Sequence, residues 1–243
     1  FRNVEIKEFA KRLPHFTNSL GMKFARVPKG KAWLGGGGGK PGDKEVEFDE
    51  DFYLGVYEVT QEEWEKVTGA AQPSTFSRNG TRKDAVKDIS DADLKRFPVE
   101  TINWDEALLF VDKLNALDTQ PGWIYRLPTE DEWEYACRGG PVDRLTSSFD
   151  YYFDKPSNSV GQDQANGNWS TSHRTCKVGS YKPNALGLYD MHGNVWEWCI
   201  HSAKAKDGSA QPQTRGGSHA GLPGIIFRTK DGKAWARTFR AWD

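Results

Sequence analysis

The sequence has few cysteines, few methionines and no long apolar run. Its three cysteines, Cys137, Cys176 and Cys199, are too widely spaced for a disulfide framework or a Cys-x-x-Cys zinc site, which favours a reducing compartment. Mean hydropathy is −0.74, and no stretch approaches the roughly 18 apolar residues that a membrane span needs. The opening residues, FRNVEIKEFAKRLPHF, lack the apolar segment of a secretory signal. These absences predict a cytoplasmic protein.

Neither sign of charge is in excess. The chain has 33 Lys and Arg residues against 34 Asp and Glu, which gives a net charge of −1 and a pI of about 6.6. Such a balance argues against nucleic acid or anionic lipid as a partner. What the sequence does have is an aromatic content of 13%, with ten Trp residues, which is enough to bury a core in a chain of 243 residues.

Alternating apolar and polar residues predict strands in the first part of the chain. Residues 22–35 alternate like a pair of strands around a turn at Pro28-Lys29-Gly30, and residues 44–57 alternate again. The polar, broken stretch at 70–97 is typical of a long surface insertion.

Three helix starts are marked by capping boxes. Thr60, Asn103 and Thr129 each precede a Glu by three positions, and apolar residues at helical spacing follow each of them. Short helices are therefore expected after these residues. Strands, short capped helices and long loops together predict the α+β class. We expect a lead-in over residues 1–17 and a single domain over 18–243.

Two motifs that suggest chemistry have simpler interpretations. A glycine run ends at Lys40, but Pro41 follows where a phosphate-binding loop needs Ser or Thr, so a plain loop is expected. The acidic set at 130–134 lies in a first helical turn, where carboxylates complement the helix dipole. Neither motif predicts a catalytic site.

A third motif, over residues 187–198, offers oxygen ligands. Asp190 and Glu197 flank a turn at Gly193-Asn194, and a tight turn can add backbone carbonyls to two carboxylates. The spacing is compatible with a calcium site, but it is also that of an ordinary turn between buried aromatic residues. Both interpretations remain open at this point.

Several long blocks resemble the formylglycine-generating enzyme family, also called sulfatase-modifying factors. The signature blocks are RLPTEDEWEYACRGG (126–140), LGLYDMHGNVWEWC (186–199) and RGGS (215–218). Earlier blocks follow in the family's order at 18–30, 52–67 and 97–115. The resemblance implies an elaborated, single-domain form of the C-type-lectin-like fold, with short capped helices, twisted antiparallel strands, long loops and calcium in many members.

Calcium ligands are also implied by this resemblance. They are the side chains of Asp190 and Glu197 and the carbonyls of Gly193 and Val195. A second family site would use Asn166 and the carbonyl of Gly167, but its acidic ligand has no counterpart in residues 169–176. Only the first calcium site is therefore expected.

The sequence departs from the family's enzymes after Gly217. Those enzymes carry two cysteines there, which bind copper and oxidise a substrate cysteine to formylglycine, whereas this chain has no cysteine after Cys199. Copper(I) is selected by soft thiolates, so neither copper nor formylglycine-generating activity is expected. Cys137 and Cys199 lie within signature blocks and are expected to pack in the core.

A different branch of the family is the closer resemblance. Variable proteins of diversity-generating retroelements carry a hypervariable ligand-binding surface between the GGS motif and a terminal Phe-Arg, and this chain has Phe239-Arg240 near its end. The resemblance implies a non-catalytic protein that binds an unknown protein or small ligand through residues 215–243. The candidate contacts are His219, Leu222, Ile225, Ile226, Phe227, Thr229, Trp235 and Arg237.

Three alternatives stay open. Part of the C-terminal segment, including Ile225, Phe227, Trp235 and Phe239, would complete a core sheet instead of a binding surface. In the second alternative, the chain is an oxidoreductase that modifies a protein cysteine. A third reading is a regulatory module fused to an upstream kinase or protease domain.

Overall fold

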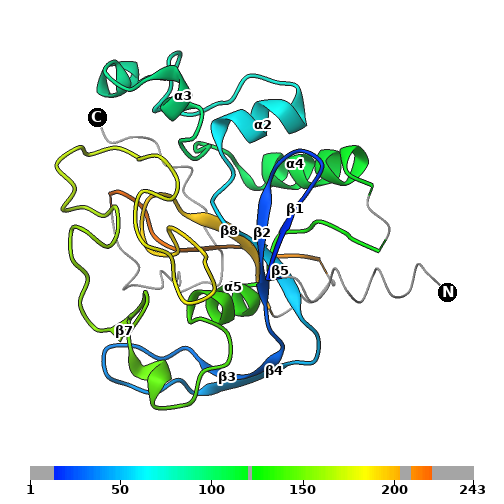
Figure 1. The fold of residues 1–243 in the computed structure, drawn as a ribbon, viewed down its shortest axis with the longest axis vertical. Helices are drawn as coiled ribbons and strands as arrows, with labels where there is room; N and C mark the ends of the chain where they lie inside the picture. Colours follow the sequence, from blue (N-terminus) through cyan, green and yellow to red (C-terminus); the bar gives the residue numbers. More distant parts are fainter. Residues whose placement is uncertain (1–13, 120–121, 203–208, 221–243) are drawn as a thin grey trace.

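The computed structural model describes residues 14–119, 122–202 and 209–220 (Figure 1). Its strands are β1 (His15–Thr17), β2 (Lys23–Val27), β3 (Gly30–Leu34), β4 (Lys44–Phe48), β5 (Phe52–Gly55), β6 (Tyr151–Tyr152), β7 (Pro156–Ser157), β8 (Glu197–Ile200) and β9 (Pro212–Arg215). Its helices are α2 (Gln61–Thr68), α3 (Asp91–Leu94), α4 (Trp104–Leu117) and α5 (Glu130–Cys137), with short 3₁₀ turns at Lys83–Val86 and Thr146–Ser148. This mixture confirms the predicted α+β class.

The strands form small antiparallel sheets. The largest has the order β1-β2-β5, and the others pair β3 with β4, β6 with β7 and β8 with β9. In Figure 1, α2, α3 and α4 gather at one end of the molecule and the β3–β4 pair at the other, with α5 and β8 between them.

The strands on either side of Pro28 do not pair with each other. β2 is hydrogen-bonded to β1 at one edge and to β5 at the other, while β3 pairs with β4. The prediction of a strand pair over residues 22–35 was therefore right about the strands and wrong about their partners, because both edges of β2 are occupied. β1 lies within the segment predicted as a lead-in.

All three predicted capping boxes are present. Thr60 Oγ1 accepts the Glu63 N–H at 3.2 Å, and Glu63 Oε2 accepts the Thr60 N–H at 2.9 Å. Asn103 and Thr129 are capped in the same reciprocal way at the starts of α4 and α5. Each cap is worth about 1 kcal/mol, because it satisfies amides that a helix start leaves unpaired.

The first core lies between β2, β3 and α5. Tyr135 is fully buried in it, and its hydroxyl donates to the carbonyl of Pro28 at 2.8 Å. Cys137 and Cys199 are buried there, which confirms their predicted place in the core. The other fully or largely buried members are Ala25, Val27, Ala32, Leu34, Val56, Trp133, Ala136, Val142, Leu188 and Met191.

A second core joins α2 to α4. The rings of Trp64 and Phe110 stack with centroids 5.6 Å apart, and Leu114 packs beside them. Met22, Val67 and Val99 complete the buried set. α4, with 14 residues, is the longest described helix, and none of the helices in the described ranges is both long and apolar enough to cross a bilayer.

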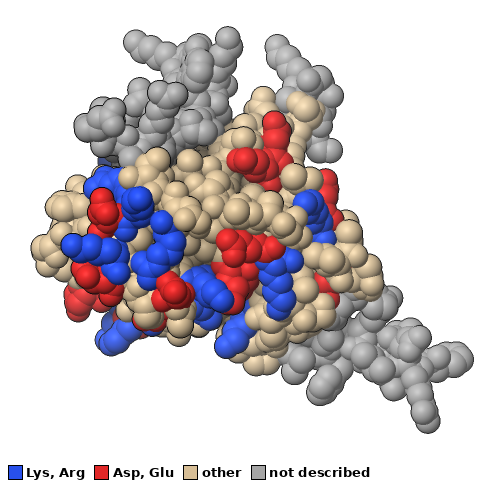
Figure 2. Space-filling model, turned by 90° about the horizontal axis from the view of Figure 1, so that it is seen from above, with Lys and Arg blue, Asp and Glu red and all other residues tan. Residues whose placement is uncertain are grey.

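The predicted surface insertion at 70–97 has a small core of its own. Phe76, Val86, Leu94 and Phe97 bury one another, which the polar composition did not indicate. Figure 2 shows Lys and Arg intermingled with Asp and Glu on the face seen from above, so the described residues of that face carry no broad field of one sign.

The glycine-rich loop is held by carboxylates of the same chain. The Gly35 N–H donates to Glu134 Oε1 and the Gly38 N–H to Asp150 Oδ1, both at 2.7 Å. These amides are the groups that would cradle a phosphate in a phosphate-binding loop. The structure thus agrees with the prediction of a plain loop.

Candidate functional site

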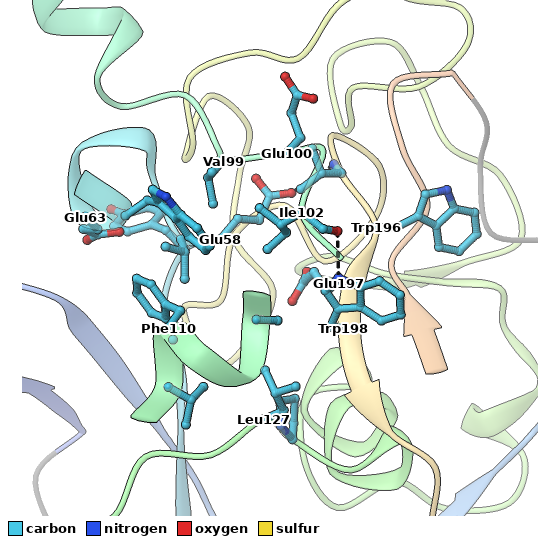
Figure 3. Close-up of a pocket in the computed structure, with 18 of the residues that line it drawn as sticks. Glu58, Glu63, Val99, Glu100, Ile102, Phe110, Leu127, Trp196, Glu197 and Trp198 are labelled. Carbon is cyan, nitrogen blue, oxygen red and sulfur yellow. Dashed lines mark hydrogen bonds between the residues drawn. The ribbon is translucent and has the colours of Figure 1, made fainter. Parts of the chain in front are cut away.

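A cavity of about 300 Å³ separates the second core from β8 (Figure 3). Its walls are mostly apolar and aromatic side chains from β2, β5, α2, α4 and β8 and from the loops at 99–102 and 125–128. They include Phe24, Leu54, Trp64, Val99, Ile102, Phe110, Leu114, Tyr125, Leu127 and Trp198. A concave apolar space of this size with a few polar groups is typical of a small-molecule site.

Trp198 fixes one wall of the cavity. Its indole Nε1 donates to the carbonyl of Ile102 at 3.3 Å, the contact drawn as a dashed line in Figure 3. Its ring meets Trp104 edge-on, with centroids 5.6 Å apart. β8 and the start of α4 are thereby joined across the cavity, so the wall is pre-formed.

Asn194 organises the polar end of the cavity. It adopts a left-handed backbone conformation (φ 59°), which Asn tolerates better than most residues, and it is almost completely buried. Its amide nitrogen donates to Glu58 Oε2 at 2.6 Å, and its amide oxygen accepts the Cys176 N–H at 3.0 Å and Asn166 Nδ2 at 3.1 Å. The predicted turn thus joins three distant segments.

Glu58 is a site residue that the sequence analysis did not identify. Its second oxygen, Oε1, accepts the Val195 N–H at 3.1 Å, so the carboxylate spans the turn. It lies in the block 52–67 as an isolated acid between apolar residues. A carboxylate flanked by Tyr57 and Val59 was the available signal, because such a position is expected to be buried.

Three buried carboxylates interact around this turn. Burial raises the pKa of Glu197 to about 7, with a further contribution from the charge of Asp190. Burial likewise raises the pKa of Asp190 to about 6, and burial with the charges of Asp190 and Glu197 raises the pKa of Glu58 well above its usual value. A bound cation would relieve this concentration of negative charge.

The predicted calcium ligands have the right donor chemistry. Asp190 Oδ2 accepts the Gly179 N–H at 2.7 Å and Glu197 Oε2 accepts the Trp133 indole N–H at 3.0 Å, so neither bond uses the second oxygen of either carboxylate. A β-carbon at Gly216 would lie 3.6 Å from both Glu197 Oε1 and the Val195 carbonyl oxygen, which therefore face the same small space.

Glu197 Oε1 and the Val195 carbonyl oxygen are the two predicted calcium ligands that share this space. The Gly193 N–H donates to the Gly216 carbonyl at 2.8 Å, which fixes the turn next to that space. Among the described residues, no group of three His, Cys, Asp or Glu side chains converges as a metal site would. The predicted set would therefore need its backbone carbonyls to reach the coordination number of calcium.

Of the eight candidate ligand contacts, the structure describes His219. It lines the cavity, its N–H donates to the Asn194 carbonyl at 2.9 Å, and its ring meets Phe76 edge-on at 5.2 Å. Burial lowers the pKa of His219. The other seven lie outside the described residues: Leu222, Ile225, Ile226, Phe227, Thr229, Trp235 and Arg237.

None of the three thiols is activated. Burial raises the pKa of Cys137 and of Cys199, and it raises the pKa of Cys176 to about 12. A nucleophilic cysteine reacts as the thiolate, and burial of these three side chains disfavours that form.

The chain matches a known protein family over nearly its whole length. Residues 12–242 match the sulfatase-modifying factor enzyme 1-like domain. The chain is 33% identical over 184 residues to the chaperone protein LppX of Paenibacillus barcinonensis, an alignment that covers 65% of this chain and 64% of that protein. It is 31% identical over 183 residues to the formylglycine-generating enzyme of Bos taurus, with 60% and 48% covered. The chain thus spans about half to two thirds of the length of these relatives.

A solved structure extends the likeness to the fold. Treponema denticola variable protein 1 superposes with a TM-score of 0.60 at 27% sequence identity, covering 85% of this chain and 87% of that one. The domain match and this superposition confirm the predicted family resemblance and the C-type-lectin-like fold.

Proposed function

Because the chain belongs to the family of sulfatase-modifying factor enzyme 1-like domains and has their C-type-lectin-like fold, we propose that it is a non-catalytic ligand-binding protein of the variable-protein type. The observation that carries this proposal is the state of the thiols. Cys137 and Cys199 are buried, Cys176 is half-buried, all three have raised pKa values, and no cysteine follows Cys199 in the sequence.

The position of the cavity supports binding instead of catalysis. Ser218 of the GGS motif and His219, the first of the candidate ligand contacts, both line it. The ligand surface would combine the other candidate contacts with the described walls of the cavity. The likeness to a variable protein favours this reading, whereas the identity to a formylglycine-generating enzyme favours an oxidoreductase.

An activity assay separates the two functions. The purified chain is loaded with copper(I) and incubated in air with a Cys-x-Pro-x-Arg peptide. The mass of the peptide is then measured by mass spectrometry. We expect an unchanged mass, because copper(I) needs thiolates that these cysteines do not supply. Conversion of the peptide thiol to an aldehyde would overturn the proposal in favour of the oxidoreductase.

Calcium is the cofactor that the proposal includes. The side chains of Asp190 and Glu197 and the carbonyls of Gly193 and Val195 would hold it, and the ion would offset the charge of the buried carboxylates. A ligand that binds only the folded state stabilises it by about 2.7 kcal/mol at a hundredfold excess over its Kd.

Chelation tests the calcium proposal. Removing calcium should lower the melting temperature of the unmodified chain and of a Glu50→Gln control, which changes an exposed carboxylate. Glu197→Gln should melt at the same temperature with and without chelator. A chelator without effect on the unmodified chain would show that 190–197 is an ordinary turn.

A further inference from the structure

Acidic side chains outnumber basic ones around the cavity. The described residues that line it include the basic pair Lys23 and Arg126 and four acids, Glu58, Glu63, Glu100 and Glu197. The guanidinium of Arg126 is already engaged, since it donates to both oxygens of Glu132 at 2.7 and 2.6 Å. Lys23 is exposed, so its ammonium group is solvated. Burial lowers the pKa of His219, which keeps its imidazole neutral at pH 7. The described lining therefore carries an excess of negative charge.

The backbone brings two of these carboxylates to one side of the cavity. The segment that ends in Glu100 runs antiparallel to the one that begins with Glu58, since the Val99 N–H donates to the Val59 carbonyl at 2.8 Å and their neighbours form an antiparallel bridge. In this register Glu58 and Glu100 are opposite each other, so their β-carbons lie on the same side, about 5 Å apart. Figure 3 shows both at the end of the cavity away from Leu127. Like charges at opposite positions repel, so this end favours a cation.

These two carboxylates lack the positive partner that other buried carboxylates have. Three carboxylates of α5 each have a guanidinium partner at 2.6 or 2.7 Å, in the pairs Glu130–Arg215, Glu132–Arg126 and Glu134–Arg138. Within the described ranges, Glu58 and Glu100 accept hydrogen bonds from neutral amides and hydroxyls instead. Burial raises the pKa of Glu100, as expected for a carboxylate without a cation beside it. Because buried charges are normally paired, a cation is the missing partner.

Glu58 has room for a further donor. Each of its oxygens accepts one bond, from Asn194 Nδ2 at 2.6 Å and from the Val195 N–H at 3.1 Å. An ionised carboxylate offers about four acceptor sites, so about two remain. The existing bonds hold the carboxylate in place without using it up.

The backbone next to Glu100 is strained. Thr101 has a φ of 65°, in the left-handed region, which is a marked outlier for a β-branched residue. Its hydroxyl donates to Glu100 and lies 3.1 Å from the hydroxyl of Thr75. Thr101 also lines the cavity, so the strain fixes a carboxylate at the cavity wall. Strain of this kind is typical of ligand-binding positions.

The remainder of the cavity suits an apolar body. Trp64 and Phe110 stack on one side, and Trp198 forms the wall on the side of β8. A volume of about 300 Å³ is at the small end of the range for ligand pockets, which favours a molecule with a single ring. The faces of aromatic rings also attract cations.

We propose that the cavity binds a small amine, with its ammonium group at Glu58 and Glu100 and its aryl or alkyl body between α4 and β8. An ammonium group donates three hydrogen bonds and carries the charge that these two carboxylates lack. Glu197 is left for calcium. This inference rests on the proposed ligand-binding function and assigns its ligand class.

Calorimetric titration with three probes, in buffer that contains calcium, tests this assignment. Phenylpropylamine, phenylpropanol and phenylpropionate share one body and differ in the head group. We expect phenylpropylamine to bind at least about tenfold more tightly than phenylpropanol, because its ammonium group pairs with buried carboxylates. Phenylpropionate should bind most weakly, because the same carboxylates repel it.

Substitutions separate the head group from the body. Glu100→Gln and Glu58→Gln should each weaken phenylpropylamine about tenfold and leave phenylpropanol unchanged, because Gln keeps an acceptor but not the charge. Glu50→Gln, at an exposed position outside the cavity lining, is the matched control and should change neither. Ala107→Leu should weaken both probes alike, because it fills space that their shared body needs. Thermal denaturation checks that each variant folds, and Glu100→Gln alone decides if Glu58→Gln does not.

The titration has outcomes that contradict the proposal. Equal binding of phenylpropylamine and phenylpropanol, preference for phenylpropionate, or no binding of any probe would each refute the amine assignment. So would a folded Glu100→Gln variant that binds phenylpropylamine as tightly as the unmodified chain. An unchanged peptide mass in the copper assay together with no amine binding would reject the ligand class alone, whereas aldehyde formation would reject the ligand-binding function itself.

Discussion

The two main cores of this domain differ in how completely they are filled. In the first core, Ala25, Val27 and Tyr135 have no exposed surface and contact neighbours on all sides. In the second, Trp64 and Phe110 pack against each other, but a cavity of about 300 Å³ lies between them and β8. Close packing specifies a rigid scaffold, whereas an unfilled apolar space leaves room for a ligand. The first core thus holds the domain rigid, and the second core borders the space in which a ligand could bind.

Truncation of one aliphatic side chain in each core gives the largest expected difference. Leu34 is 1% exposed in the first core. Leu34→Ala should lower the free energy of unfolding of the protein by about 2–5 kcal/mol, because a cavity replaces well-packed atoms. Ile102→Ala, at the wall of the existing cavity, should lose about 1 kcal/mol, because fewer contacts are removed. Urea denaturation measures both, and equal losses would remove the distinction between the cores.

The pH dependence of stability should report a histidine beside the first core. Nε2 of His192 accepts the Tyr152 N–H at 3.0 Å, and burial lowers the pKa of His192 from 6.5 to about 4. The unfolded chain therefore binds the proton more readily between these values, so stability falls as pH falls from about 6.5 to about 4, by about 3 kcal/mol.

His192→Gln tests this pH dependence. Gln keeps an acceptor for the Tyr152 N–H but does not titrate. The unmodified chain loses stability as pH falls through this range and the variant does not, so the difference between their free energies of unfolding should shrink. His173→Gln, at an exposed position, is the control and should follow the unmodified chain. Parallel profiles for His192→Gln and the unmodified chain would contradict the prediction.

Two buried alanines allow the smallest and sharpest comparison. Ala136 on α5 has no exposed surface in the first core, and Ala136→Leu should cost about 1–3 kcal/mol by overpacking. Ala107 on α4 lines the cavity, so Ala107→Leu should cost less than about 1 kcal/mol, because the larger side chain can occupy existing space. Thermal denaturation measures the stability cost of each substitution. An equal cost at both positions would mean that the cavity is not available to a side chain.

The candidate site was only partly predictable. Asp190 and Glu197 were identified because carboxylates on either side of a turn are visible in a linear motif. Glu58 and Glu100 were not, because an isolated carboxylate carries no pattern until the fold places it at the wall of the cavity. The C-terminal contacts other than His219 lie outside the described residues and stay predictions.

The sequence by itself determined the local elements of this protein. The helix starts at Thr60, Asn103 and Thr129 depend on contacts within four residues, so their capping boxes could be read directly. Only the tertiary structure decided that β2 and β3 join different sheets, because alternation defines a strand and not its partner. The cavity has the same origin, since its walls come from segments that meet only after folding, and no local pattern encodes a space between them.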